Sequence, residues 1–170
     1  IRRLRGLLKK GEFRFAPLDL NEVIGEVVTL AGADAILRNV AIALEIASDL
    51  PPVRGDRIQL QQVLLNLILN GLEAMGASVP GDRRLVIRTT RGEGRTVRVE
   101  VQDAGVGIKE ERLDRIFEPF YTTKPSGMGM GLSITRSIVK AHGGEIRAAS
   151  NPDRGATFSF TLPAIGDPAP

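Results

Sequence analysis

The stretch DRIQLQQVLLNLILNGLEAM, residues 56–75, predicts the most distinctive element of the fold, a helix capped by Asp56. Apolar side chains occupy nearly every side of this helix, so we expect it to be buried. Five of its polar residues recur at spacings of three, four, four and three, and they therefore form one narrow stripe. They are Gln59, Gln62, Asn66, Asn70 and Glu73.

The two asparagines of this stripe, Asn66 and Asn70, point to a network or a ligand. A buried amide without a partner costs about 1–3 kcal/mol, so two of them one turn apart need hydrogen bonds. Asparagine oxygens suit a hard cation such as Mg²⁺, which binds through few protein oxygens plus substrate phosphates. An ordinary solvent-facing stripe is the alternative that the stripe alone leaves open.

The residues on both sides of this helix predict further helices and strands. Helices are predicted from a cap at Asp19 or Asn21 to Leu37, and over residues 109–116 and 130–141. Strands are predicted over residues 13–18, 40–47, 85–90, 96–101, 145–149 and 156–162. We therefore expect one mixed sheet covered on one face by helices.

The composition is that of an ordinary globular domain, with 42% hydrophobic and 25% charged residues among 170. The lack of cysteine and the single histidine, His142, exclude a disulfide framework and a Cys- or His-rich metal centre. The net charge of +3 is dispersed and aromatic residues are few, so we expect no nucleic-acid binding. No apolar run reaches the ~18 residues of a membrane span, so we expect no membrane contact by this fragment.

A second motif follows the strand predicted to end near Val101. It reads Asp103-Ala104-Gly105-Val106-Gly107-Ile108, and its glycines allow a sharp turn and a close approach to a ligand. An ionised carboxylate only accepts hydrogen bonds, so Asp103 suits the exocyclic amine of adenine and repels the carbonyl oxygen of guanine. An Asp-Gly turn without a ligand is the alternative.

A third motif, Gly127-Met128-Gly129-Met130-Gly131, precedes a predicted helix. Exposed glycine amides and the positive end of the helix together suit phosphate groups. The motif is neither a dinucleotide fingerprint, because Leu132 stands where the last glycine is needed, nor a Walker A loop. Lys124 lies close enough in sequence to reach a phosphate, and a flexible loop without a ligand is the alternative.

Taken in order, five motifs resemble the ATP-binding domain of sensor histidine kinases. They are Asn66-x-x-x-Asn70, Asp103-Ala-Gly105-Val-Gly107, Phe117-Glu-Pro-Phe120, Gly127-x-Gly129-x-Gly131-Leu132 and Gly155-Ala156-Thr157-Phe158. The resemblance implies the α/β sandwich shared by gyrase, Hsp90, MutL and histidine kinases, with ATP and Mg²⁺ as cofactors. In that two-layer fold, a mixed, mostly antiparallel sheet is covered on one face by about three helices. The stretch 118–144 looks most like kinases of nitrogen regulation and oxygen sensing.

The resemblance also implies roles for single residues. The catalytic set would be Asn66, Asn70 and Lys124, with Asn70 ligating Mg²⁺ and Asn66 supporting the metal and phosphate side. The nucleotide-binding set would be Asp103, Gly105, Gly107, Ile108, Tyr121, Gly127, Gly129, Gly131, Leu132 and Thr157. In that set, Asp103 would bind adenine N6, Ile108 would line the ring pocket, and Thr157 would support the adenine end through Asp103 or water. The segment from Tyr121 to Gly131 would form the lid over ATP.

Two departures and one substitution refine this expectation. Glu73 stands where many members of the family carry lysine, and Gly71 stands where alanine is usual. Asn66 stands where the ATP-hydrolysing relatives place a general-base glutamate, which favours phosphoryl transfer to a protein over hydrolysis. A non-catalytic nucleotide-sensing module and an ATP hydrolase remain the alternatives.

The phosphate acceptor is expected elsewhere, because His142 belongs to a glycine-rich turn at a helix end. We expect residues 1–10 to end a dimerisation and phosphoacceptor helix, residues 11–163 to form the catalytic domain and residues 164–170 to be a flexible tail. The sequence begins with Ile1 rather than Met, as a piece of a longer protein would. The expected partners are the protein's own dimerisation domain and a response regulator. We expect a monomeric fragment, a homodimeric full-length protein and a cytoplasmic location.

Overall fold

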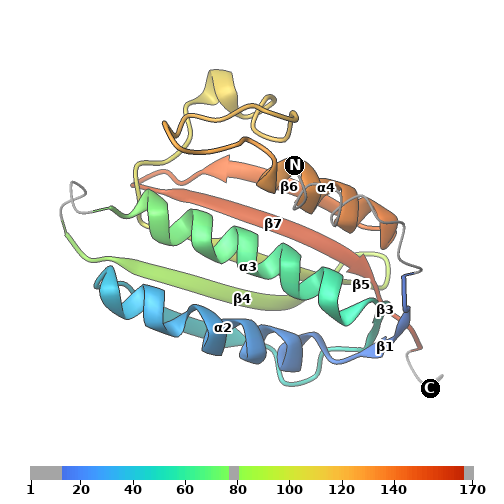
Figure 1. Cartoon of the computed structure of the whole chain (residues 1–170). Coiled ribbons are helices and arrows are strands. Elements are labelled where there is room, and N and C mark those ends of the chain that lie inside the picture. The colour runs from blue at the N-terminus through green and yellow to red at the C-terminus, as the bar shows by residue number, and fades with distance from the viewer. Residues whose placement is uncertain (1–12, 77–80, 167–170) are drawn as a thin grey trace.

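The computed structural model describes residues 13–76 and 81–166, and these form two layers (Figure 1). One layer is a five-stranded sheet in the order β2-β4-β5-β7-β6. Its strands are β2 (Ala41–Ile46), β4 (Arg84–Gly92), β5 (Thr96–Gln102), β6 (Glu145–Ser150) and β7 (Ala156–Pro163). Only β2 and β4 pair in parallel, so the predicted mixed and mostly antiparallel sheet is confirmed.

Three helices form the second layer and lie side by side on one face of the sheet (Figure 1). They are α2 (Leu20–Leu37), α3 (Arg57–Ala74) and α4 (Gly131–Ala141). Both long helices begin at aspartate caps: Asp19 accepts a hydrogen bond from the amide of Asn21, and Asp56 accepts one from the amide of Gln59. This arrangement confirms the expected two-layer α/β sandwich.

The core lies between the two layers. Strands β4, β5 and β7 bury every second residue, as in Leu85, Ile87 and Thr89 of β4, because one sheet face meets the helices and the other meets solvent. The central helix α3 packs so closely on this face that a β-carbon at Gly71 would approach Leu85 Cδ1 to 2.5 Å. Glycine at this position therefore serves close packing of α3 on the sheet.

The chain enters the described domain next to the start of α3. Residues 13–15 precede a short strand, β1 (Ala16–Leu18), which pairs with β3 (Val53–Gly55) in a separate two-stranded sheet. The amide of Arg14 donates to Asp56 Oδ2, so the entering segment is bonded to the cap of α3. The predicted strand thus begins at residue 16 rather than 13, and β3 was not predicted.

One other prediction differs from the structure. The helix predicted over residues 109–116 is only a 3₁₀ turn, Glu110–Arg112, with no buried residue and no side-chain cap. At the start of the predicted tail, the amides of Ala164 and Ile165 donate to the carbonyls of Arg95 and Pro52. Residues 1–10, predicted to end a dimerisation helix, lie outside the described residues.

Candidate functional site

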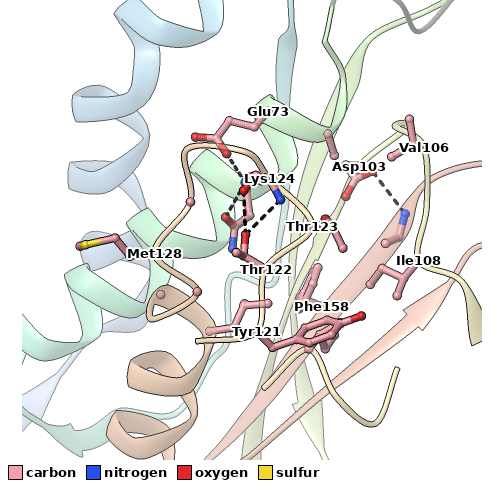
Figure 2. A pocket seen from close by; sticks show the side chains of 18 of the residues that line it. Glu73, Asp103, Val106, Ile108, Tyr121, Thr122, Thr123, Lys124, Met128 and Phe158 are labelled. Atoms are coloured by element: carbon pink, nitrogen blue, oxygen red, sulfur yellow. Dashed lines mark hydrogen bonds and ion pairs between the residues drawn. The ribbon is translucent and has the colours of Figure 1, made fainter. Parts of the chain in front are cut away.

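A cavity of about 680 Å³ opens between α3, the loop after β5 and the segment that leads into α4. Figure 2 shows Glu73 and Lys124 pointing toward one another on one side and Asp103 on the other. The predicted site residues that line the cavity are Asn70, Asp103, Gly107, Ile108, Tyr121, Lys124, Gly127, Gly129, Gly131 and Leu132. The structure therefore brings together three motifs that are far apart in the sequence.

Asp103 lies at one end of the cavity and is only 4% exposed. Its Oδ1 accepts hydrogen bonds from the amides of Gly105 and Ala156, at 2.8 and 3.3 Å. In the described parts of the chain, every fully buried side-chain oxygen has a hydrogen-bond partner. Oδ2 of Asp103 has no protein partner there, so it is not fully buried and reaches the cavity that Asp103 lines. Burial raises the pKa of Asp103, and the two backbone hydrogen bonds counter this only partly.

The loop after Asp103 is held from both sides. A β-carbon at Gly105 would approach the carbonyl oxygen of Ala74 to 2.5 Å, so only glycine lets this loop lie against the end of α3. Gly107 has φ of +75°, a left-handed conformation that also favours glycine. Ser150 accepts a hydrogen bond from the amide of Ile108 at 3.0 Å and donates one to its carbonyl oxygen. The position of Ile108 on the cavity wall is thereby fixed.

Thr157 does not line the cavity and touches Asp103 only indirectly. Its hydroxyl donates to Asn151 Oδ1 at 2.6 Å, and Asn151 Nδ2 donates to the carbonyl oxygen of Asp103 at 3.1 Å. Gly155 lies in the same turn, where a β-carbon would approach that carbonyl to 2.0 Å. Thr157 therefore supports the backbone, rather than the carboxylate, of Asp103.

The segment from Tyr121 to Met128 covers one side of the cavity; we call it the lid. One hydrogen bond closes its base, from the amide of Phe120 to the carbonyl of Gly129 at 2.8 Å. Both residues have left-handed backbone conformations, with φ of +65° and +68°. The guanidinium of Arg115 lies 4.7 Å from the centre of the Tyr121 ring, which anchors the start of the lid.

The polar stripe of α3 supplies the opposite side of the cavity. Asn70 and Glu73 both face Lys124 of the lid. The ammonium of Lys124 lies 3.3 Å from Asn70 Oδ1 and pairs with the carboxylate of Glu73. Two side-chain oxygens of one helix are thus arranged around a positive charge.

Asn66, one turn earlier on α3, does not line the cavity. Its Nδ2 donates to the carbonyl of Gly131 and to Thr135 Oγ1, both at 3.3 Å. The side chain therefore fastens the start of α4 to α3. No side chain caps that first turn of α4, so its amides are open to an anionic ligand.

The cavity is polar at two ends and apolar between them. Asp103 accepts hydrogen bonds at one end, whereas Lys124, the glycine turn and the start of α4 offer positive charge and amides at the other. Ile108, Ile116 and Phe158 line the wall between these ends. Such a layout fits a molecule with a flat, hydrogen-bonding ring at one end and phosphates at the other.

Residues 55–165 match the family of histidine kinase-, DNA gyrase B- and HSP90-like ATPases. The chain belongs to this family. Sensor protein FixL of Bradyrhizobium diazoefficiens is 44% identical over 167 residues, which are 98% of this chain and 33% of that protein. This chain spans about a third of the length of the curated relatives it matches first.

Solved structures of the family agree with this assignment. The catalytic domain of histidine kinase ThkA is 36% identical with a TM-score of 0.78, covering 89% of this chain and 96% of that one. ThkA was also solved in complex with the response regulator TrrA, at 33% identity and a TM-score of 0.76, covering 96% and 48%. Full-length ShkA in complex with AMPPNP is 29% identical with a TM-score of 0.80, covering 94% and 33%. The chain thus matches the ATP-binding catalytic domain of sensor histidine kinases.

Seen as a kinase-type ATP site, the cavity contains most of the residues expected from the sequence. Asn66, Gly105 and Thr157 are the exceptions and do not line the cavity. Asn66 bonds to Gly131 and Thr135, the Gly105 amide donates to the Asp103 carboxylate, and Thr157 donates to Asn151. Ser150 and Asn151, which hold the backbone of Ile108 and Asp103 in place, were missed. Their only sequence signal is a turn-forming Ser-Asn-Pro-Asp stretch, which does not name the partner. Among the described residues, no helix has the length and apolarity needed to cross a membrane.

Proposed function

We propose that this chain donates the γ-phosphate of Mg-ATP to a histidine on a separate dimerisation domain. The observation that carries the proposal is the state of Asn66. It stands where the ATP-hydrolysing relatives place a glutamate, it has no basic atom, and its amide is engaged with Gly131 and Thr135. Residue 66 therefore offers no general base to activate water for hydrolysis, whereas the groups that would bind ATP are retained.

The two carboxylates on the cavity wall are poorly placed as bases. Asp103 lies at the ring end, and Glu73 is paired with Lys124. Phosphoryl transfer asks chiefly for positioning and charge neutralisation, which Lys124, the glycine amides and the start of α4 supply. This set of groups supports a phosphate donor rather than a hydrolase.

The residues beside Lys124 fit a magnesium ion carried by ATP. Asn70 Oδ1 and the Glu73 carboxylate already face a cation, and both are the hard oxygen donors that Mg²⁺ prefers. No group of three or more His, Cys, Asp or Glu side chains that could hold a metal occurs in the described ranges, so phosphates would complete the coordination. Asn70 would hold the ion, which when bound neutralises charge on the phosphates.

The acceptor belongs to another domain because the single histidine is fully engaged. His142 is 6% exposed, its Nε2 accepts from the amide of Asp56 at 3.0 Å, and its Nδ1 lies 2.8 Å from the carbonyl oxygen of Ile138. These contacts engage both ring nitrogens of His142 with the backbone. In the whole protein we propose a cytoplasmic homodimer that passes its phosphoryl group to a response regulator, as the ThkA–TrrA complex suggests for its relative.

The proposed function is tested by adding γ-labelled ATP and Mg²⁺ to this chain together with a histidine-bearing dimerisation domain. We expect label on that domain and little free phosphate, and a His→Gln acceptor serves as the control. Rapid phosphate release without transfer would identify a hydrolase. ATP binding with neither outcome would identify a nucleotide-sensing module. Asn70→Ala should abolish transfer together with its Mg²⁺ dependence.

A further inference from the structure

Glu73 lies on the cavity wall three residues after Asn70. The Lys124 ammonium bridges the carboxylate of Glu73 and Oδ1 of Asn70, so it rests on two oxygens of α3 (Figure 2). Lys124 is the one basic side chain among the described lining residues. The ammonium of Lys124, the positive charge best placed to meet phosphates, is therefore already paired with the carboxylate of Glu73 in the same cavity.

This ion pair contributes little to the stability of the fold. The side chains of Lys124 and Glu73 are 42% and 41% exposed, and pairs this exposed are weak because water screens them. The pair is consequently easy to exchange for another partner. It also joins the lid to α3, the two walls between which the phosphates would lie.

We propose that Glu73 is a positioning residue that makes ATP binding dependent on Mg²⁺. This inference rests on the proposed function of the cavity. Without a divalent ion, Glu73 retains Lys124 and its carboxylate repels the triphosphate. With Mg-ATP, Glu73 and Asn70 present their oxygens to the ion, and Lys124 is released from them to contact phosphates. A lysine at position 73, as in many relatives, would reduce this dependence.

The size of the effect follows from one charge at short range. Removing a carboxylate a few ångströms from a triphosphate, in a partly solvated site, should tighten metal-free binding by about tenfold. Binding of Mg-ATP should change much less, because Glu73 then faces a cation. The quantity that reports on Glu73 is therefore a ratio: the dissociation constant of ATP in EDTA divided by the dissociation constant of ATP in Mg²⁺.

The test compares ATP titrations in EDTA and in MgCl₂ for wild type, Glu73→Gln and Glu73→Lys. We expect the ratio to fall about tenfold in Glu73→Gln and further in Glu73→Lys. Glu145→Gln is the matched control: it neutralises an exposed carboxylate that pairs with Arg147 on β6, and its ratio should equal that of wild type. Thermal melts check that every variant is folded.

Two outcomes would overturn the inference while leaving the proposed function intact: an unchanged ratio in Glu73→Gln, or weaker metal-free binding by this variant. If wild type bound ATP neither in EDTA nor in MgCl₂, the proposed function would instead be refuted. A double variant tests the route through Lys124. If Glu73 acts by retaining Lys124, Glu73→Gln should have a smaller effect in a Lys124→Gln background, whereas equal effects in both backgrounds would contradict that route.

Discussion

At the scale of single residues, the carboxylate of Asp103 is divided between the fold and the cavity. Oδ1 accepts from the Gly105 and Ala156 amides, which leaves Oδ2 for the cavity. Asparagine has only one oxygen, so Asp103→Asn must give up one of these two roles. We expect Asn to keep the backbone bonds and to weaken ATP binding by about 10- to 100-fold, as calorimetry would show. Retained affinity and retained preference over GTP would contradict the adenine role.

The raised pKa of Asp103 predicts that the same variant is more stable than wild type without nucleotide. A carboxyl whose pKa is higher in the folded state stabilises the fold below its unfolded pKa, and this contribution is lost as pH rises through the folded pKa. Asp103→Asn, which has no proton to lose, should melt at a higher temperature at neutral pH. The difference should vanish in acid below the ordinary aspartate value of about 3.9. Scanning fluorimetry over pH measures both.

The raised pKa also predicts how ATP binding depends on pH. The carboxyl must be ionised for Oδ1 to accept from the backbone amides while Oδ2 accepts from adenine, so affinity should fall as pH falls through the raised pKa of Asp103. The phosphates of ATP titrate as well, and the Asp103→Asn variant records their part of the pH dependence. A wild-type profile parallel to that of the variant would contradict this prediction.

Sequence reasoning found Asp103 but not the residues that position it. A carboxylate followed by two spaced glycines at a strand end is visible within six residues. Ser150 and Asn151 act on Ile108 and Asp103 across 42 and 48 residues, and such partners are set only by the pairing of β6 and β7 beside β5. For Asn66, the face of the helix on which it lies was predictable from the sequence, but its contact with α4 was not.

At the scale of elements, Gly129 decides whether the lid can close at its base. A β-carbon there would approach the carbonyl carbon of Phe120 to 2.4 Å, at a φ of +68°. Gly129→Ala should therefore break the Phe120–Gly129 contact and weaken Mg-ATP binding by about tenfold or more, with the core intact. Gly94→Ala is the control, since Gly94 has φ of +64° but no atom within 4 Å of its β-carbon position.

The control separates backbone strain from the contact. Gly94→Ala should cost about 1–2 kcal/mol of unfolding free energy, through its left-handed φ alone, and leave ATP affinity unchanged. If Gly94→Ala weakened ATP binding as much as Gly129→Ala, the lid base would not be the cause. Urea unfolding and ATP titration of both variants distinguish the two results.

The elements that the sequence predicted well are those with a strong period. The apolar pattern of α3 and the alternation in β4, β5 and β7 reflect burial on one face, which local residues record. β3 and the Glu110–Arg112 turn were missed or mispredicted because three residues carry no period. Their existence depends on β1 and on the route of the loop, and neither is local information.

At the scale of the whole molecule, His142 connects segments that are distant in the chain. Its ring accepts from the Asp56 amide, its Nδ1 faces Ile138, and Phe13 and Phe15 pack against it with ring centres 6.3 and 4.8 Å away. His142→Ala would leave a hole and an unpaired Asp56 amide, whereas the Ile138 carbonyl would keep its bond from the backbone amide of residue 142. We expect it to cost about 2–4 kcal/mol of unfolding free energy in urea.

Phe13→Ala provides the comparison for His142, because Phe13 is 48% exposed and belongs to the same cluster. Its loss should cost less than about 1.5 kcal/mol, since only part of the ring is buried. A His142→Ala variant as stable as Phe13→Ala would show that the histidine is not a structural centre. Because His142 is not the proposed phosphoryl acceptor, a separate acceptor domain should still be labelled by both variants.

The single hydrogen bond at the base of the lid bears on turnover. We expect the eight residues 121–128 to swing aside when spent ADP is exchanged for ATP, and no helix or strand of the described chain lies within them. A bond of this kind contributes about 1 kcal/mol net, less than twice RT, so thermal motion at room temperature is sufficient to break it. The Lys124–Glu73 pair also holds the lid to α3, but it is exposed and weak, so we expect the domain to reload without loosening its core.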